Sequence, residues 1–378
     1  MAKFGKKNVI KIDPLAYNIC LLGEPKIGKT TVIKEILEKL VGEDGYMFLE
    51  MAGEAGADAI NGIIYEDIDE WEDLDNVIED IENNRNSDYK EIKAIVADTY
   101  DGWIKLAERE AIRLWNKDHP DKIADSIDAA WNGFQKGQSK AFELMFDVIV
   151  RLRSIGISTI VIGHVKNKEV TDIATGTTYQ TLTSDVEKIY FNLLKKKMHF
   201  IGLAYYDRTI ITEKTGKKNI VTKKDITVNK ITDETRKIKF RDDNMALDSG
   251  SRFADIIEEI PLDPDALITA LTDAIKAEFE KNGNKKSVTE AANEQEAEKE
   301  KKVQKNIEKI QSQKKVDGEA NEFNDLKEKI TEFIKLNKND NPSILKPVLK
   351  AMKSYEYKNP SMIETLEHAR EIAKLIED

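Results

Sequence analysis

Two kinds of apolar pattern alternate along the first half of the chain. Short, nearly continuous apolar runs occur at residues 19–22, 46–49, 92–97 and 158–162, and the segments between them place apolar residues at helical spacing. Val32, Ile33, Ile36, Leu37 and Leu40 form the first such stripe. Because continuous apolar strands separated by amphipathic helices are typical of a parallel sheet covered on both faces, we predict an α/β fold.

The second half of the chain changes character several times. We predict a polar loop over 166–185, a lysine-rich helix over 185–198, and alternating, hairpin-like antiparallel strands from 200 to 240. Residues 280–318 are rich in Lys, Glu, Gln and Asn, which indicates a solvated helix or a disordered linker. Helical spacing returns at 323–376. The predicted domains are a core (1–265), a charged linker (266–320) and a small helical bundle (321–378).

Composition narrows the possible classes of protein. The net charge is −11 and the pI is about 5.2, which argues against a uniformly basic nucleic-acid coat but leaves room for a local basic groove. The single cysteine, Cys20, excludes disulfides within the chain and Cys-based metal sites. We find no apolar run of transmembrane length and no signal-peptide core, so we predict a cytoplasmic protein without a membrane partner.

The first strand and helix enclose a glycine-rich loop with the pattern Gly-x4-Gly-Lys-Thr. Gly23 and Gly28 allow backbone torsions in which successive N–H groups converge on phosphate oxygens. Lys29 would reach the β- and γ-phosphates, and the Thr30 hydroxyl would complete a Mg²⁺ shell. We therefore predict ATP and Mg²⁺ as cofactors. The predicted nucleotide-binding residues are Gly23, Glu24, Pro25, Lys26, Ile27, Gly28, Lys29, Thr30 and Thr31.

Polar residues end three of the predicted strands. Asp98 would bind Mg²⁺ beside Thr30, usually through water, and Glu50 would polarise a water for attack on the γ-phosphate. His164 would sense the γ-phosphate through a neutral imidazole. The predicted catalytic residues are thus Glu50, Lys29 and His164, and the predicted metal ligands are Thr30 and Asp98. Strand-end caps and structural polar residues are the alternative interpretation of Glu50, Asp98 and His164.

These segments carry a family resemblance. The phosphate loop and the strands ending at Glu50, Asp98 and His164 resemble the RecA-type ATPase core, and Phe48-Leu-Glu-Met51 resembles a segment of replicative helicases. The segments Ile162-Gly-His-Val-Lys166, Thr183-Ser-Asp-Val-Glu-Lys188 and Leu247-Asp-Ser-Gly-Ser-Arg-Phe253 resemble phage-encoded RecA-like nucleotide-binding proteins, the group that includes single-strand annealing recombinases. This resemblance covers residues 15–262. The resemblance implies a RecA-like P-loop core, Glu50 as the catalytic carboxylate, and an ATPase stimulated by single-stranded DNA in phage recombination or replication, located in the host cytoplasm.

The same resemblance implies where partners bind. DNA contact would fall on the loop after the His164 strand, which offers Lys166, Lys168 and Tyr179. A homo-oligomer would supply a basic residue to the neighbouring γ-phosphate. The candidates for that residue are Lys195, Lys197, Arg208 and Arg252. The chain departs from RecA recombinases by its short segment before the first strand and by the polar interval 116–138.

Two other classes of function remain open from the sequence. The chain could be a nucleotide-controlled scaffold that recruits a protein partner through its C-terminal helices. It could also be a helicase loader or packaging-type motor. Salt-dependent single-strand binding favours the ATPase, tight nucleotide binding without DNA stimulation favours the scaffold, and coupled unwinding or translocation favours the motor.

Overall fold

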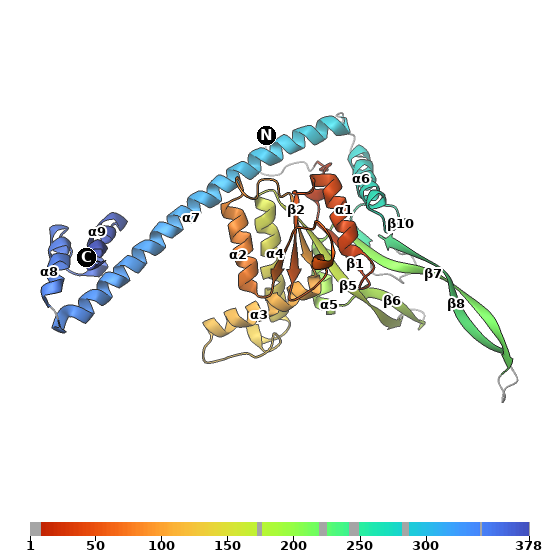
Figure 1. Cartoon of the computed structure of the whole chain (residues 1–378), viewed down its shortest axis with the longest axis horizontal. Coiled ribbons are helices and arrows are strands. Elements are labelled where there is room, and N and C mark those ends of the chain that lie inside the picture. Colours follow the sequence, from red (N-terminus) through yellow and green to blue (C-terminus); the bar gives the residue numbers. More distant parts are fainter. Residues whose placement is uncertain are drawn as a thin grey trace. The chain divides into compact units, whose positions relative to one another are not determined.

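The computed structural model describes residues 9–171, 176–218, 225–241, 249–281, 287–340 and 342–377 (Figure 1). By its contacts the chain divides into two compact units, one ending at Gln304 and the other beginning at Lys305. None of the described helices combines the length and the apolar composition needed to cross a membrane.

The first unit is built on one large sheet, and its strands follow the predicted apolar runs. The strands are β1 (Ile19–Gly23), β2 (Tyr46–Met51), β3 (Tyr65–Ile68), β4 (Ala94–Asp98), β5 (Ser158–Thr171), β6 (Thr178–Ser184), β7 (Phe200–Lys218), β8 (Asp225–Lys239), β9 (Gly250–Ser251) and β10 (Glu259–Pro261). The helices are α1 (Lys29–Val41), α2 (Trp71–Asn83), α3 (Tyr100–Asp118), α4 (Lys136–Ser154), α5 (Lys188–Lys197) and α6 (Pro264–Lys281). A further helix, α7 (Val288–Asp340), begins in the first unit and ends in the second. Short 3-10 turns are η1 (Pro14–Ala16), η2 (Ala57–Ala59) and η3 (Ala130–Asn132).

The strand order within the described residues is β10-β8-β7-β1-β5-β4-β2-β3. The pairs from β7 to β3 are parallel, whereas β8 and β10 add antiparallel strands at one edge. Crossover helices connect parallel strands and cover both faces of the sheet, which is why the strands are apolar on both sides. The predicted α/β class, with a mainly parallel sheet and added antiparallel strands, is confirmed.

The core lies on both faces of this sheet. Alternate strand residues such as Leu21 and Phe48 pack with Ile33 of α1 and with Leu271 of α6 in one buried cluster. On the other face, Val161 of β5 lies with apolar residues of α3, α4 and α5. The α6 side chains in the first cluster include residues that the sequence analysis placed in the linker. The predicted domain boundaries remain predictions.

One feature departs from the sequence-based expectation. The polar loop expected over 166–185 is instead a hairpin, because β5 continues past His164 and pairs antiparallel with β6 from Val165↔Ser184 to Thr171↔Thr178. The threonine-rich composition of this segment suits strands better than a loop. The antiparallel strands predicted from 200 to 240 are confirmed, because β7 and β8 form a longer antiparallel pair that projects from the sheet (Figure 1).

The second unit is a small helical domain, as predicted. Ile330 of α7, Val348 and Met352 of α8 (Pro342–Ser354), and Ile372 of α9 (Leu366–Glu377) share one buried cluster. Ile363, which follows the turn η4 (Pro360–Met362), completes it. The spacing of these residues is the helical spacing seen in the sequence, so the C-terminal helices of the predicted fold are confirmed.

Candidate functional site

The glycine-rich loop lies between the end of β1 and the start of α1 (Figure 1). A Cβ atom on Gly23 would lie 2.9 Å from the Cβ of Ala204, so the close approach of β1 to β7 requires glycine there. Gly28 precedes the helix with a φ of 107°, a left-handed conformation that side chains disfavour. These torsions place the loop at the N-terminus of α1, where free N–H groups and the helix dipole favour an anion.

Lys29 is buried at this loop, with only 6% of its surface exposed. Its Nζ donates hydrogen bonds to the carbonyl oxygens of Gly23 (3.1 Å) and Glu24 (3.0 Å). Burial lowers the pKa of the ammonium, whereas Asp98 and Glu54 act in the opposite direction. The Lys29 ammonium is therefore held next to the loop by two neutral carbonyl acceptors. Phosphate oxygens could replace these carbonyls and form stronger, charge-assisted hydrogen bonds.

Thr30 and Asp98 form a pair of hard oxygen donors next to the loop. The Thr30 hydroxyl donates to Oδ2 of Asp98 at 2.7 Å, and Asp98 ends β4 with 3% of its surface exposed. Burial raises the pKa of Asp98 to about 6, although the Thr30 hydrogen bond and Lys29 lower it. A buried carboxylate beside a partly buried hydroxyl, with its negative charge poorly solvated, fits the ligand set that Mg²⁺ prefers.

We expect Asp98→Asn to stabilise the ligand-free chain while impairing its use of Mg²⁺. Because the folded chain holds the Asp98 proton more tightly than the unfolded chain, the free energy of unfolding falls as the pH rises from about 4 through about 6. Removing the charge should therefore add up to about 3 kcal/mol at pH 7. The Mg²⁺ concentration needed for turnover should rise about ten- to hundredfold. Thermal unfolding and Mg²⁺ titrations measure both effects; a variant with lower stability and unchanged Mg²⁺ dependence would contradict this assignment.

Glu50 is buried at the end of β2 and is occupied by backbone donors. Its Oε1 accepts hydrogen bonds from the N–H groups of Gly56 (2.8 Å) and Ala57 (2.6 Å). The side chain is 3% exposed. Two charge-assisted bonds of this kind fix the loop that follows β2. The structure thus gives Glu50 a loop-holding role, and its catalytic role remains a prediction.

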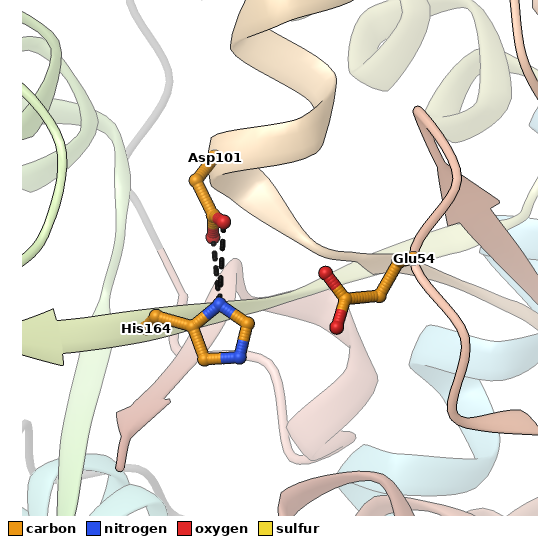
Figure 2. Close-up of side chains that lie close together, drawn as sticks. All are labelled: Glu54, Asp101 and His164. Carbon is orange, nitrogen blue, oxygen red and sulfur yellow. Dashed lines mark hydrogen bonds and ion pairs between the residues drawn. The ribbon is translucent and has the colours of Figure 1, made fainter. Parts of the chain in front are cut away.

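Three other side chains meet at the same edge of the sheet. Glu54 lies on the loop after β2, Asp101 in the first turn of α3, and His164 on β5 (Figure 2). One ligand-type atom of each lies within 4.8 Å of the others. His164 Nδ1 is 3.2 Å from Oδ2 of Asp101, and Figure 2 shows both carboxylates directed toward the imidazole.

Electrostatics tie this group to the phosphate loop. The hydrogen bond to Asp101 raises the pKa of His164 despite opposing effects of burial and of Lys29. Burial raises the pKa of Asp101, but hydrogen bonds, led by that from His164, outweigh burial and leave the pKa below its usual value. The raised pKa of His164 favours the imidazolium, which donates from both ring nitrogens, over the neutral ring expected from the sequence, which has one donor.

The sequence analysis missed Glu54 and Asp101. Asp101 follows Asp98 by three residues and begins a helix, and Glu54 follows Glu50 by four in a small-residue loop. The available signal was a carboxylate that follows soon after a strand end. In each pair, however, the sequence analysis assigned the function to the first carboxylate, Glu50 or Asp98. The structure places Thr30 in contact with Asp98, and Lys29 acts electrostatically on both Asp98 and His164, while the predicted roles of these residues remain predictions. It adds Glu54 and Asp101 to them.

The predicted DNA contacts lie on the β5–β6 hairpin. Lys166 donates to the Asp185 carbonyl (2.8 Å) and pairs with its carboxylate (3.1 Å), while Lys168 is exposed. The backbone of Tyr179 pairs with Val170, and its side chain lies outside the described part of the chain. Both lysines therefore follow His164 directly along one strand.

The candidates for a basic residue acting on a neighbouring subunit are scattered. Lys195 lies over the Phe191 ring and Lys197 over the Phe146 ring. Arg208 pairs with Glu234 at 2.6 Å, and Arg252 donates to the carbonyl of Lys196. No contact within the described chain selects one of the four, and this part of the assignment remains a prediction.

Comparison with known proteins adds one finding. A family model described as an AAA domain matches residues 15–259, which is well over half of the chain and includes the phosphate loop and every strand end discussed above. No curated protein matches the chain.

Proposed function

Because the chain belongs to the AAA domain family, we propose that it is a Mg²⁺-dependent, RecA-like ATPase that acts on single-stranded DNA in phage recombination or replication. A phosphate-loop ATPase domain of this family implies nucleotide binding and hydrolysis. The observation that carries the proposal is that β5 joins His164, beside the phosphate loop, to the hairpin with Lys166 and Lys168. One continuous strand thus connects His164, the proposed phosphate-sensing side chain, with the candidate DNA surface.

The chain's residues divide the chemistry among them. Lys29 and the loop N–H groups would hold the phosphates of ATP, and Thr30 and Asp98 would hold Mg²⁺, which supplies charge neutralisation when bound. Glu54 lies beside Thr99, whose hydroxyl is 3.3 Å from Oε2, and is the carboxylate best placed to orient and polarise water. Asp101 fixes the ring of His164 through Nδ1, so that in the imidazolium form the other ring nitrogen can donate toward the γ-phosphate.

Binding to DNA rests on charge and on the shape of the hairpin. Exposed lysines at the surface of a two-stranded ribbon can follow a phosphate backbone, and an aromatic residue such as Tyr179 suits base stacking. The overall charge of −11 confines this attraction to a local surface. A homo-oligomer would supply the missing basic residue to the γ-phosphate and make hydrolysis depend on assembly.

The C-terminal unit supports one additional role. Its separate buried cluster, built on Ile330, Val348 and Ile372, indicates that it folds around its own core. A self-contained helical unit suits recruitment of a protein partner. The nucleotide-controlled scaffold is therefore the second candidate, and it shares the same phosphate loop.

The test of the DNA proposal is ATP turnover with and without single-stranded DNA at low and moderate salt. We expect DNA to stimulate turnover, and we expect the stimulation to fade as salt rises because phosphate contacts release counterions. Lys168→Gln should reduce the stimulation and its salt dependence without changing basal turnover, and Lys309→Gln, on α7, is the matched control. Turnover that ignores DNA at every salt concentration would remove the DNA proposal and favour the scaffold.

A further inference from the structure

A side chain from outside the phosphate loop contacts the loop backbone. Arg236 lies on β8, far from the loop in sequence, and its Nη1 donates to the carbonyl oxygen of Ile27 at 3.0 Å. A Cβ atom on Gly28 would lie 3.1 Å from the same nitrogen. The guanidinium therefore sits against the peptide bond that joins Ile27 to Gly28.

This hydrogen bond sets the direction of a donor. In a planar trans peptide, the C=O of one residue and the N–H of the next point to opposite sides. Because Arg236 holds the Ile27 carbonyl on its own side, the Gly28 N–H is directed away from the arginine. Peptide planes next to glycine rotate easily, and Gly28 has a φ of 107°. The Ile27–Gly28 peptide therefore needs a hydrogen-bond partner from outside the loop to keep one orientation.

The backbone is held at both ends of the contact, whereas the Arg236 side chain itself is exposed. The Ile27 side chain is fully buried in the core cluster. The backbone carbonyl of Arg236 accepts a hydrogen bond from the N–H of Leu262 (2.9 Å), and Arg236 is paired with Tyr206 across β7 and β8. Among the described residues, no carboxylate lies within ion-pairing distance of the guanidinium, so its interaction with the loop has no competing anion there.

We propose that Arg236 is a positioning residue of the nucleotide site, which orients the Gly28 N–H toward the phosphates of a bound nucleoside di- or triphosphate. The inference rests on the proposed nucleotide-binding function. Arg236 binds the back of the loop, so it preorganises a donor without occupying the place of the phosphate. Preorganisation of this kind lowers the cost of ordering the loop when the ligand binds.

The test compares the full-length chain with its Arg236→Met and Arg236→Lys variants. Arg236→Met should lower the affinity for ADP about tenfold, which is the loss expected for one hydrogen bond of roughly 1.4 kcal/mol. The affinity for pyrophosphate should fall by the same factor, because the lost contact is between the Gly28 N–H and the phosphates. Arg236→Lys, which keeps one donor, should recover part of the affinity. Lys230→Met, an exposed cation on the same strand, is the control and should bind as the unchanged chain does.

Amide exchange at Gly28 separates positioning from general stability. In the ligand-free Arg236→Met variant the Gly28 amide should exchange faster, whereas the thermal midpoint should stay close to that of the unchanged chain. The inference would be overturned if Arg236→Met bound both ADP and pyrophosphate as tightly as the unchanged chain does. It would also be overturned if the variant lost affinity for ADP alone. If the unchanged chain binds neither ligand, the proposed function fails first, and the two failures are thereby distinguished.

Discussion

Replacing Lys29 with methionine should weaken ATP binding by about a hundredfold or more. The ammonium is buried and rests on the carbonyls of Gly23 and Glu24 until a stronger acceptor arrives. A charge-assisted bond to phosphate contributes roughly 3 kcal/mol at such a site, and methionine keeps the apolar stem while removing the charge. Titration of the purified chain with a fluorescent ATP analogue measures the loss directly.

The same helix offers a matched control. Lys39, in the last turn of α1, is exposed and pairs with Asp265, so Lys39→Met removes an equal charge away from the loop. It should bind ATP as the unchanged chain does. If Lys29→Met retained full affinity while remaining folded, the phosphate loop would not be the nucleotide site.

Replacing Glu54 with glutamine should leave ATP bound but slow its hydrolysis by about 10²- to 10³-fold. Glutamine preserves the size of the side chain and can still accept from Thr99, but it cannot take a proton from water. Binding should be nearly unchanged because the contacts of the phosphate loop are intact. Single-turnover hydrolysis alongside equilibrium ATP binding separates the two quantities.

Glu50→Gln provides the contrasting case. Its oxygen can still accept from Gly56 and Ala57, so we expect a modest loss of stability and at most a several-fold loss of turnover. The family resemblance predicts instead that Glu50→Gln abolishes hydrolysis. If that result is found and Glu54→Gln is active, the catalytic carboxylate is Glu50 and the assignment of Glu54 falls.

Local sequence signals predicted the parts of the site that one segment encodes. Gly23, Gly28, Lys29 and Thr30 follow one another between an apolar run and an amphipathic stripe, so both their chemistry and their position could be derived. Asp98 was found because parallel strands end at one edge of the sheet, which brings the end of β4 near the loop after β1.

Long-range contacts were beyond the sequence alone. Arg236 reaches Ile27 only because β8 pairs with β7 and β7 pairs with β1. The spacing of residues within β8 does not predict that contact. Glu50 and Glu54 both follow β2, and only the backbone donors of Gly56 and Ala57 distinguish them. The β5–β6 hairpin was hidden because its polar, threonine-rich strands lack the apolar alternation that marks a buried face.

The most direct test of the central claim is ATP turnover by the purified full-length chain, measured with Mg²⁺, with a chelator, and in the Glu54→Gln variant. Hydrolysis by a phosphate-loop site built on Lys29, Asp98 and Glu54 predicts turnover that requires Mg²⁺ and is lost in the variant while ATP still binds. Turnover that survives both the chelator and Glu54→Gln would contradict it.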